Sequence, residues 1–353
     1  MKILFVTLEQ SARQNLKVLL NNKFIQSNID KFYTFGMEKE GLPFRDLTNI
    51  KIKSLMGLVD ICKNLKYVFS LRNSLYLLEK ENNFTHIFFI DSFDFSKFYL
   101  NKYKNKSIKF CQLIGPSVFI WKKNKAKFIN KYFHHIFSIF EIERKFYVKE
   151  KYSYIGHPLL KNIIQKNSKK FPIKNIGIFL GSRYQEIINN ISIIYNLIND
   201  LKKLDDFNFQ FFVTKEFEIL IKNYFIDKNF QFSLNDQEYY NKLSKLDFAF
   251  ACSGTVHLEL SSSQIPHFIF YKANWINYLI FKFFVRSKYL SLVNIFNKKS
   301  CIKEFIQSNF NHNILFSEFE YLFRSKDKFT DYSNLMIDSL NKSNIQKFNS
   351  NII

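Results

Sequence analysis

The feature that most constrains the fold is a repeated alternation between short apolar runs and longer polar or amphipathic segments. Runs rich in β-branched and aromatic residues lie at residues 2–8, 86–90, 108–114, 135–140 and 152–155. After the first run, Leu16, Leu19 and Leu20 recur at helical spacing. Alternating strand and helix signals are typical of repeated βα units. The first half of the chain is therefore predicted to form an open parallel sheet.

The same rhythm restarts after a lysine-rich, turn-prone segment at residues 165–172. Strands are predicted at residues 175–180, 207–214, 246–251 and 267–271, with helices at about residues 186–204 and through Glu259. A chain of 353 residues suits two domains, since single domains usually span roughly 100–200 residues. We expect an α/β protein with two Rossmann-like domains facing a central cleft, where ligands lie beyond the carboxyl ends of the strands.

The net charge of the chain is weaker evidence for a class of partner than it first suggests. Lys and Arg total 52 against 30 Asp and Glu, giving a formal charge of +22, which favours phosphate-rich partners. The joint abundance of Lys, Asn, Ile, Phe and Tyr is also what an AT-rich genome produces, so both explanations stay open. The hydrophobic fraction of 47% excludes a disordered chain.

The cysteines and the apolar segments indicate a cytoplasmic protein. The four cysteines have no paired spacing for a zinc site or a disulfide framework: Cys62, Cys111, Cys252 and Cys301. Charged residues enter the first 13 positions before an export signal could be completed. The most apolar stretch, at residues 275–285, is shorter than the roughly 20 residues that a spanning helix needs.

Two strand-to-helix turns in the second half are candidate phosphate sites. In Gly181-Ser182-Arg183, glycine permits close approach of the backbone, and arginine can grip phosphate oxygens. The alternative is a plain turn in which Arg183 pairs with Glu186. Ser253-Gly254-Thr255 repeats the signal, and Glu259 on the following helix could bind ribose hydroxyls or lie solvated.

Candidate acids and histidines lie in the first half. Asp91 and Asp94 follow an apolar strand, and one of them could be a general base, although both could instead cap the next helix. His157 could touch substrate or merely fasten the junction between domains. His134-His135 has no third ligand at metal spacing, so no metal site is predicted.

An amphipathic basic helix is predicted near residues 55–72, with apolar residues at helical spacing and lysines off that stripe. It could pack on the sheet or lie on an anionic bilayer. The predicted membrane-contact residues are Leu58, Val59, Ile61, Cys62, Lys63 and Lys66.

A series of motifs between residues 2 and 307 resembles the lipid-A-disaccharide synthase family. Each motif is weak alone, but their order is specific. In the first half they are Met56-Gly57-Leu58-Val59, Ile90-Asp91-Ser92-Phe93-Asp94-Phe95, Gly115-Pro116-Ser117-Val118 with Trp121, Phe146-Tyr147, and Gly156-His157-Pro158-Leu159. In the second half they are Gly181-Ser182-Arg183 with Glu186-Ile187, Ser253-Gly254-Thr255 with Leu258-Glu259, Pro266 with Tyr271-Lys272 and Asn274, Tyr289-Leu290-Ser291-Leu292-Val293-Asn294-Ile295, and Glu304-Phe305-Ile306-Gln307.

The resemblance implies a GT-B fold, with residues 1–168 as an N-terminal domain on the acceptor and membrane side, completed by residues 310–353, and residues 169–309 as the UDP-sugar domain. It implies an inverting glycosyltransferase of lipid A biosynthesis for lipopolysaccharide. The enzyme would transfer 2,3-diacylglucosamine from its UDP derivative to 2,3-diacylglucosamine 1-phosphate (lipid X), without a cofactor or metal. The implied partners are these substrates, the inner-membrane surface and a second copy, and no nucleic acid.

The resemblance also assigns site residues. By similarity, Asp94 is the essential carboxylate, and Glu9 and Ser11 remain from the family's first loop, usually Gly-Glu-x-Ser-Gly-Asp. Here Leu8, Ala12 and Arg13 replace the glycines and the aspartate, which changes the backbone freedom of that loop. On the UDP side, the motif analysis contributes Gly181, Ser182 and Glu259, and similarity contributes Arg183, Ser253, Gly254, Thr255, Asn294, Glu304 and Gln307.

Two other functions stay open at this point. One is another GT-B UDP-sugar enzyme, either a transferase or a protein like UDP-N-acetylglucosamine epimerase. The Pro116-Ser117-Val118 and Leu292-Val293-Asn294-Ile295 segments argue against it. The other is a non-catalytic basic protein that binds RNA or membranes on the same scaffold.

Overall fold

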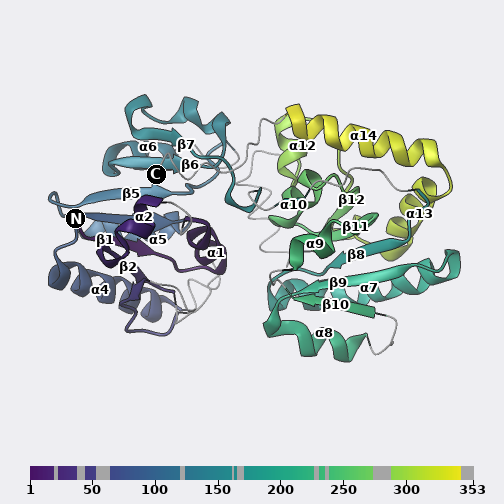
Figure 1. Cartoon of the computed structure of the whole chain (residues 1–353), viewed down its shortest axis with the longest axis horizontal. Coiled ribbons are helices and arrows are strands. Elements are labelled where there is room, and N and C mark those ends of the chain that lie inside the picture. Colours follow the sequence, from purple (N-terminus) through teal and green to yellow (C-terminus); the bar gives the residue numbers. More distant parts are fainter. Residues whose placement is uncertain are drawn as a thin grey trace. The chain divides into compact units, whose positions relative to one another are not determined.

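The computed structural model (Figure 1) describes residues 1–19, 23–37, 44–52, 64–119, 124–160, 163–164, 171–225, 230–234, 238–272 and 288–342. These residues form two compact units, one ending at Pro158 and the other starting at Leu159. The sequence placed this boundary later, between residues 168 and 169.

The first unit is a parallel sheet with helices between its strands. Its strands are β1 (Ile3–Val6), β2 (Phe32–Phe35), β3 (Arg45–Asp46), β4 (His86–Ile90), β5 (Lys109–Leu113), β6 (His135–Ser138) and β7 (Tyr152–Tyr154). Its helices are α1 (Gln10–Leu19), α2 (Lys23–Ser27), α4 (Leu65–Asn82), α5 (Phe93–Lys102) and α6 (Asn124–Tyr132), with short 3₁₀ turns η1 (Ile29–Lys31), η2 (Glu141–Phe146) and η3 (Lys149–Lys151). A further 3₁₀ turn, η4 (Pro158–Leu160), spans the residue at which the first unit ends. The described strands lie in the order β3-β2-β1-β4-β5-β6-β7, which is the open parallel sheet that the sequence predicted.

Both faces of the first sheet are apolar, because successive strand residues point to opposite sides and are apolar on both. On one face Leu4, Ile87 and Phe89 pack with buried side chains of α4, α5 and α6. On the other face, the rings of Phe5 and Phe88 lie 5.4 Å apart. A strand that is buried on both faces has a continuous run of apolar residues in its sequence. β1 and β4 show this pattern.

The second unit repeats this construction. Its strands are β8 (Asn175–Phe179), β9 (Asn208–Val213), β10 (Phe230–Leu234), β11 (Phe248–Cys252), β12 (His267–Tyr271) and β13 (Glu304–Ile306). Its helices are α7 (Tyr184–Leu204), α8 (Glu218–Tyr224), α9 (Tyr239–Leu243), α10 (Val256–Ser262), α12 (Leu292–Asn297), α13 (His312–Phe323) and α14 (Lys326–Lys342), with 3₁₀ turns η5 (Lys215–Phe217) and η6 (Gln307–Asn309). The described strands are all parallel, in the order β10-β9-β8-β11-β12-β13.

Helices cover both faces of the second sheet. Phe250 belongs to a buried cluster that includes side chains of α7, α13 and α14, whereas its neighbour Ala249 belongs to a cluster with residues of α9 and α10. The sequence assigned residues 310–353 to the first domain, and this is wrong for the described part, residues 310–342. Leu315 and Phe319 of α13 are completely buried in the same cluster as Phe250, so α13 and α14 complete the second unit.

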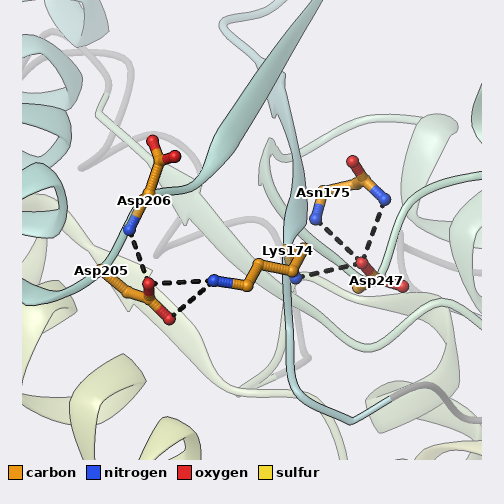
Figure 2. A network of polar contacts seen from close by, with 5 residues as sticks. All are labelled: Lys174, Asn175, Asp205, Asp206 and Asp247. Atoms are coloured by element: carbon orange, nitrogen blue, oxygen red, sulfur yellow. Dashed lines mark hydrogen bonds and ion pairs between the residues drawn. The ribbon is translucent and has the colours of Figure 1, made fainter.

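The amino ends of the second sheet are joined by a polar network (Figure 2). Asp247, just before β11, accepts hydrogen bonds from the Lys174 and Asn175 backbone N–H groups at 3.1 and 2.8 Å. The Lys174 ammonium group in turn lies 2.9 Å from Asp205. This network ties β8 to β11 and to the end of α7, at the sheet edge opposite the carboxyl ends of the strands.

Candidate active site

The carboxyl ends of four neighbouring strands bring the predicted UDP-side turns to one edge of the second sheet. The register pairs Phe179 of β8 with Ala251 of β11, Cys252 with Phe270 of β12, and Tyr271 with Ile306 of β13. The turns that follow these strands therefore emerge side by side. They contain Gly181, Ser182 and Arg183; Ser253, Gly254 and Thr255; and Gln307.

Glu186 shapes the turn after β8. Its carboxylate accepts a hydrogen bond from the Ser182 N–H at 3.1 Å and pairs with the Arg183 guanidinium at 2.8 Å. Gly181 has φ +117°, and a Cβ there would lie 2.7 Å from a Glu186 oxygen. Only glycine fits this turn without displacing Glu186.

The pairing of Arg183 with Glu186 is the alternative that the sequence left open, and the structure contains it. This ion pair does not occupy all the N–H donors of Arg183. The Arg183 side chain is 44% exposed, whereas that of Glu186 is 11% exposed. Because a guanidinium has five N–H donors, Arg183 retains donors for an anion while Glu186 fixes its orientation.

The turn after β11 is anchored at its start and open at its centre. The Ser253 N–H donates to Phe270 O at 2.8 Å, which extends the pairing of β11 with β12. A Cβ at Gly254 would meet only the Cys252 carbonyl oxygen, at 4.0 Å. Ser253, Gly254 and Thr255 thus offer small residues before the first turn of α10.

Glu259 is placed differently from either prediction. It is neither solvated nor directed at a ligand, because it is 7% exposed and its two oxygens accept hydrogen bonds from Tyr239 and Tyr240 at 3.1 and 3.2 Å. Burial raises the pKa of Glu259 to about 7, and the tyrosine hydrogen bonds oppose this shift. Its described contacts join α10 to α9.

Asn294 and Glu304 form an internal support rather than an exposed ligand pair. Asn294 is completely buried; its amide N–H group donates to Ile302 O and to Glu304, and its oxygen accepts from the Cys301 and Ile302 N–H groups. The Glu304 carboxylate also accepts from the Ser291 N–H at 2.8 Å. The Asn294 amide group is therefore satisfied internally, and its UDP-binding role stays a prediction.

His257 belongs to the same support, and the sequence did not single it out. Its Nε2 accepts a hydrogen bond from the Leu292 N–H at 3.2 Å, so α10 is joined to the first turn of α12. Burial lowers the pKa of His257 to about 4, against a backbone hydrogen bond with Gly254 that raises it. The imidazole is thus neutral at physiological pH and can act as this acceptor.

Gln307 lies at the end of β13 in the left-handed region, with φ +54°. This conformation is uncommon for residues other than glycine and is found where surrounding structure imposes it. The residue is half-buried and its carbonyl oxygen accepts from the Phe310 N–H at 3.2 Å. The turn thus keeps Gln307 at the same edge as the β8 and β11 turns.

In the first unit, Asp94 lies in the first turn of α5 and is largely exposed. Both of its oxygens lie 3.1 Å from the ammonium group of Lys125 on α6. This ion pair joins α5 to α6. The position of Asp94 also suits the positive end of a helix dipole, but the N-cap of α5 is Ser92, and the described contacts of Asp94 are with Lys125 rather than with first-turn N–H groups.

Asp91 occupies the turn between β4 and α5 with φ +62°. Its N–H donates to Leu113 O at 3.0 Å, and its carbonyl oxygen accepts from the Phe93 N–H at 2.6 Å. The strand therefore turns sharply at Asp91, and Asp94 is the more exposed of the two acids.

The remaining predicted residues of the first unit are described in part. Glu9 is half-buried before α1 and its carbonyl oxygen accepts from the Arg13 N–H at 3.1 Å. Ser11 lies in α1, and its side chain is outside the described part of the structure. His157 is 4% exposed, with its ring 6.0 Å from that of Phe140 in the same unit.

Of the predicted membrane-contact residues, only Lys66 is described. Lys66 is exposed on α4, beside Leu65 and Phe69, which are 48% and 44% exposed. The others lie outside the described residues: Leu58, Val59, Ile61, Cys62 and Lys63. Among the helices that the structure describes, none has the length and apolarity needed to cross a bilayer.

Solved structures share this fold at low sequence identity. A putative UDP-N-acetylglucosamine 2-epimerase from Listeria monocytogenes matches with a TM-score of 0.65 and 11% identity, over 99% of this chain and 93% of that one. Spinosyn rhamnosyltransferase complexed with thymidine diphosphate matches with a TM-score of 0.59 and 7% identity, over 97% and 96% of the two chains. The two parallel α/β sheets thus have the GT-B fold, which glycosyltransferases and UDP-sugar epimerases share.

Sequence comparison identifies the family within this class. The family described as Lipid-A-disaccharide synthetase matches residues 3–351, so the chain belongs to the lipid-A-disaccharide synthase family, and the predicted resemblance is confirmed. The lipid-A-disaccharide synthase of Aquifex aeolicus strain VF5 is 25% identical over 344 residues, covering 93% of this chain and 92% of the relative. That of Campylobacter jejuni subsp. jejuni serotype O:2 is 30% identical over 335 residues, 87% of each chain. The protein is thus a glycosyltransferase of lipid A biosynthesis.

Proposed function

We propose that this protein transfers 2,3-diacylglucosamine from its UDP derivative to 2,3-diacylglucosamine 1-phosphate, forming the β-1,6-linked disaccharide 1-phosphate and UDP. Family membership over residues 3–351 is the observation that carries this proposal. The structure supports it locally, because the turns after β8 and β11 lie side by side and one of them holds a fixed, half-exposed arginine.

The proposed reaction is a single displacement with inversion. Asp94 accepts the proton of the acceptor's 6-hydroxyl group while that oxygen attacks the anomeric carbon of the donor, and the bond to UDP breaks. The exposure of Asp94 supports this role, since a base must reach its substrate. The Lys125 ammonium group pairs with Asp94 and is therefore the group that the acceptor must approach or displace.

In the same proposal, the second unit stabilises the leaving UDP. Arg183 would contact the diphosphate, with its orientation set by Glu186. Backbone N–H groups around Ser253, Gly254 and Thr255 would add neutral donors. Preorganised donors of this kind act where negative charge grows in the transition state, so they accelerate departure of UDP rather than simply binding it.

The direct test is to incubate the protein with UDP-diacylglucosamine and lipid X and to identify the disaccharide by mass spectrometry. Asp94→Asn should lower kcat by roughly 10²–10⁴-fold, the usual contribution of a general base, without changing thermal stability by much. Normal turnover by this variant would remove Asp94 from the mechanism, and absence of disaccharide with the wild-type protein would overturn the proposed function.

We further propose that the protein acts at the inner-membrane surface and forms a homodimer. Two acylated substrates reside in a bilayer, and exposed Leu65, Lys66 and Phe69 on α4 combine apolar and cationic side chains suited to its interface. The dimer rests on the family resemblance and is tested by the mass of the protein in solution.

A further inference from the structure

The turns that follow β4, β5 and β6 are tied together at the carboxyl edge of the first sheet. The Asp91 N–H donates to Leu113 O at 3.0 Å, and the Ile114 N–H donates to Phe137 O at 2.9 Å. Ile114 has φ +57°, so β5 ends in a sharp turn into residues 115–118. The turn after β5 therefore lies directly beside the turn that precedes α5.

Glu143 joins this turn to the segment that follows β6. One carboxyl oxygen of Glu143 accepts a hydrogen bond from the Val118 N–H at 3.0 Å, and the other lies 2.6 Å from the Ser138 hydroxyl oxygen. That hydroxyl also lies 3.1 Å from both the nitrogen and the carbonyl oxygen of Phe140. Glu143 is 1% exposed, so this single buried carboxyl group fixes two neighbouring turns.

We propose that Glu143 is a positioning residue for the transfer reaction, which holds the turn at residues 115–118 in place beside the Asp94 turn. The inference rests on the proposed function, in which the first unit supplies the general base and binds the acceptor. Glu143 acts through the backbone and does not contact substrate, because almost none of its surface is accessible. In the chain, residues 115–118 are followed by α6. This helix carries Lys125, which forms the ion pair with Asp94.

Among the described residues, Glu143 forms no ion pair. The nearest cation in the chain, Arg144, is instead 3.7 Å from Glu141. Burial raises the pKa of Glu143 to about 8, against hydrogen bonds from Ser138 and Val118. At neutral pH the group is therefore mainly protonated.

A protonated Glu143 suits the observed hydrogen bonds. One of its oxygens accepts from the Val118 N–H and the other from the Ser138 hydroxyl group, whose oxygen can instead accept the proton of a neutral Glu143. The other titratable groups that act on this position are the Tyr147 and Tyr152 hydroxyls, and burial raises the pKa of both, so they stay neutral. Ionisation of Glu143 would leave an unpaired buried charge under the turn.

The experiment compares Glu143→Ala, Glu143→Gln and the control Glu141→Gln, which alters an exposed carboxylate of the same segment. Kinetics with donor and acceptor varied separately are measured from pH 6 to 9. Glu143→Ala should lower kcat/KM for the acceptor by roughly 10- to 100-fold, since small displacements of reacting groups are costly, and leave the UDP-dependent thermal shift intact. Glu143→Gln imitates the neutral acid and should stay within about threefold of wild type.

The pH profile separates this role from a merely structural one. Wild-type activity should fall as the pH rises through about 8, whereas Glu143→Gln should lack that fall. A folded Glu143→Ala protein with unchanged acceptor kinetics overturns the proposal. So does a Glu143→Gln profile that matches the wild-type profile. A wild-type protein that makes no disaccharide contradicts the proposed function instead, so the two failures are distinguishable.

Discussion

At the scale of single residues, the turn after β8 depends on one glycine. Gly181→Ala places a Cβ 2.7–2.8 Å from Glu186 atoms at a φ of +117°, so either the turn or Glu186 must move. We expect a loss of stability of about 1–3 kcal/mol and weaker UDP binding, because Glu186 would release Ser182 and Arg183. Thermal unfolding with and without UDP measures both effects.

Gly254→Ala is the matched control for that substitution. Its Cβ would enter open space, with only the Cys252 carbonyl oxygen at 4.0 Å, so its cost to stability in the absence of UDP should be much smaller. Equal losses of stability in the two variants would show that the crowding at Gly181 is not what the turn depends on.

The residue scale also shows where the sequence was informative. The pairing of Arg183 with Glu186 was foreseen because both lie on one helical turn, where spacing fixes proximity. The burial of Glu259 was not, because Tyr239 and Tyr240 come from another helix. Nor does local pattern reveal the contact of Glu143 with Val118, which joins two separate strand ends. Such contacts depend on tertiary packing.

At the scale of elements, most buried apolar strands were predicted, and several strands toward the sheet edges were missed. The predictions for β1, β4, β8 and β12 agree with the structure within a few residues because these strands are buried and continuously apolar. No strand was predicted at β2, β3, β10 or β13, which lie toward the sheet edges. A strand such as β3, with two residues, is defined by its neighbour rather than by its own pattern.

The Asp247 network gives a prediction about how elements are joined. Asp247→Ala removes the acceptor for the half-buried Lys174 and Asn175 N–H groups, and we expect a loss of stability of roughly 2 kcal/mol, since partly buried donors without partners are costly. UDP binding should change little at the ligand concentrations that saturate the folded protein, because the network lies at the opposite sheet edge. Urea unfolding tests the first point and UDP titration the second.

Asp206→Ala is the control for this network. Asp206 enters it only through its backbone N–H, which donates to Asp205 at 2.7 Å, and its own side chain is exposed. The control should therefore be close to wild type. A comparable loss in both variants would contradict the anchoring role of the Asp247 carboxylate.

At the scale of the whole molecule, the charge of +22 favours association with anionic surfaces. We expect the protein to sediment with vesicles that contain anionic phospholipid at low salt, and less so at high salt, since screening shortens the range of these attractions. Neutral vesicles should retain little protein. RNA added as a competitor tests whether the charge serves a nucleic acid instead, in which case RNA would bind tightly and UDP would give no thermal shift.

The position of a charge should affect vesicle binding more than the net charge of the protein does. Lys66→Glu alters the exposed α4 surface beside Leu65 and Phe69, whereas Lys245→Glu makes the same charge change at an exposed position of the second unit. Because each cation near an anionic bilayer is worth about 1 kcal/mol, Lys66→Glu should weaken vesicle binding severalfold more than Lys245→Glu. If the two variants lose binding equally, α4 is not the contact surface, and association follows from net charge alone.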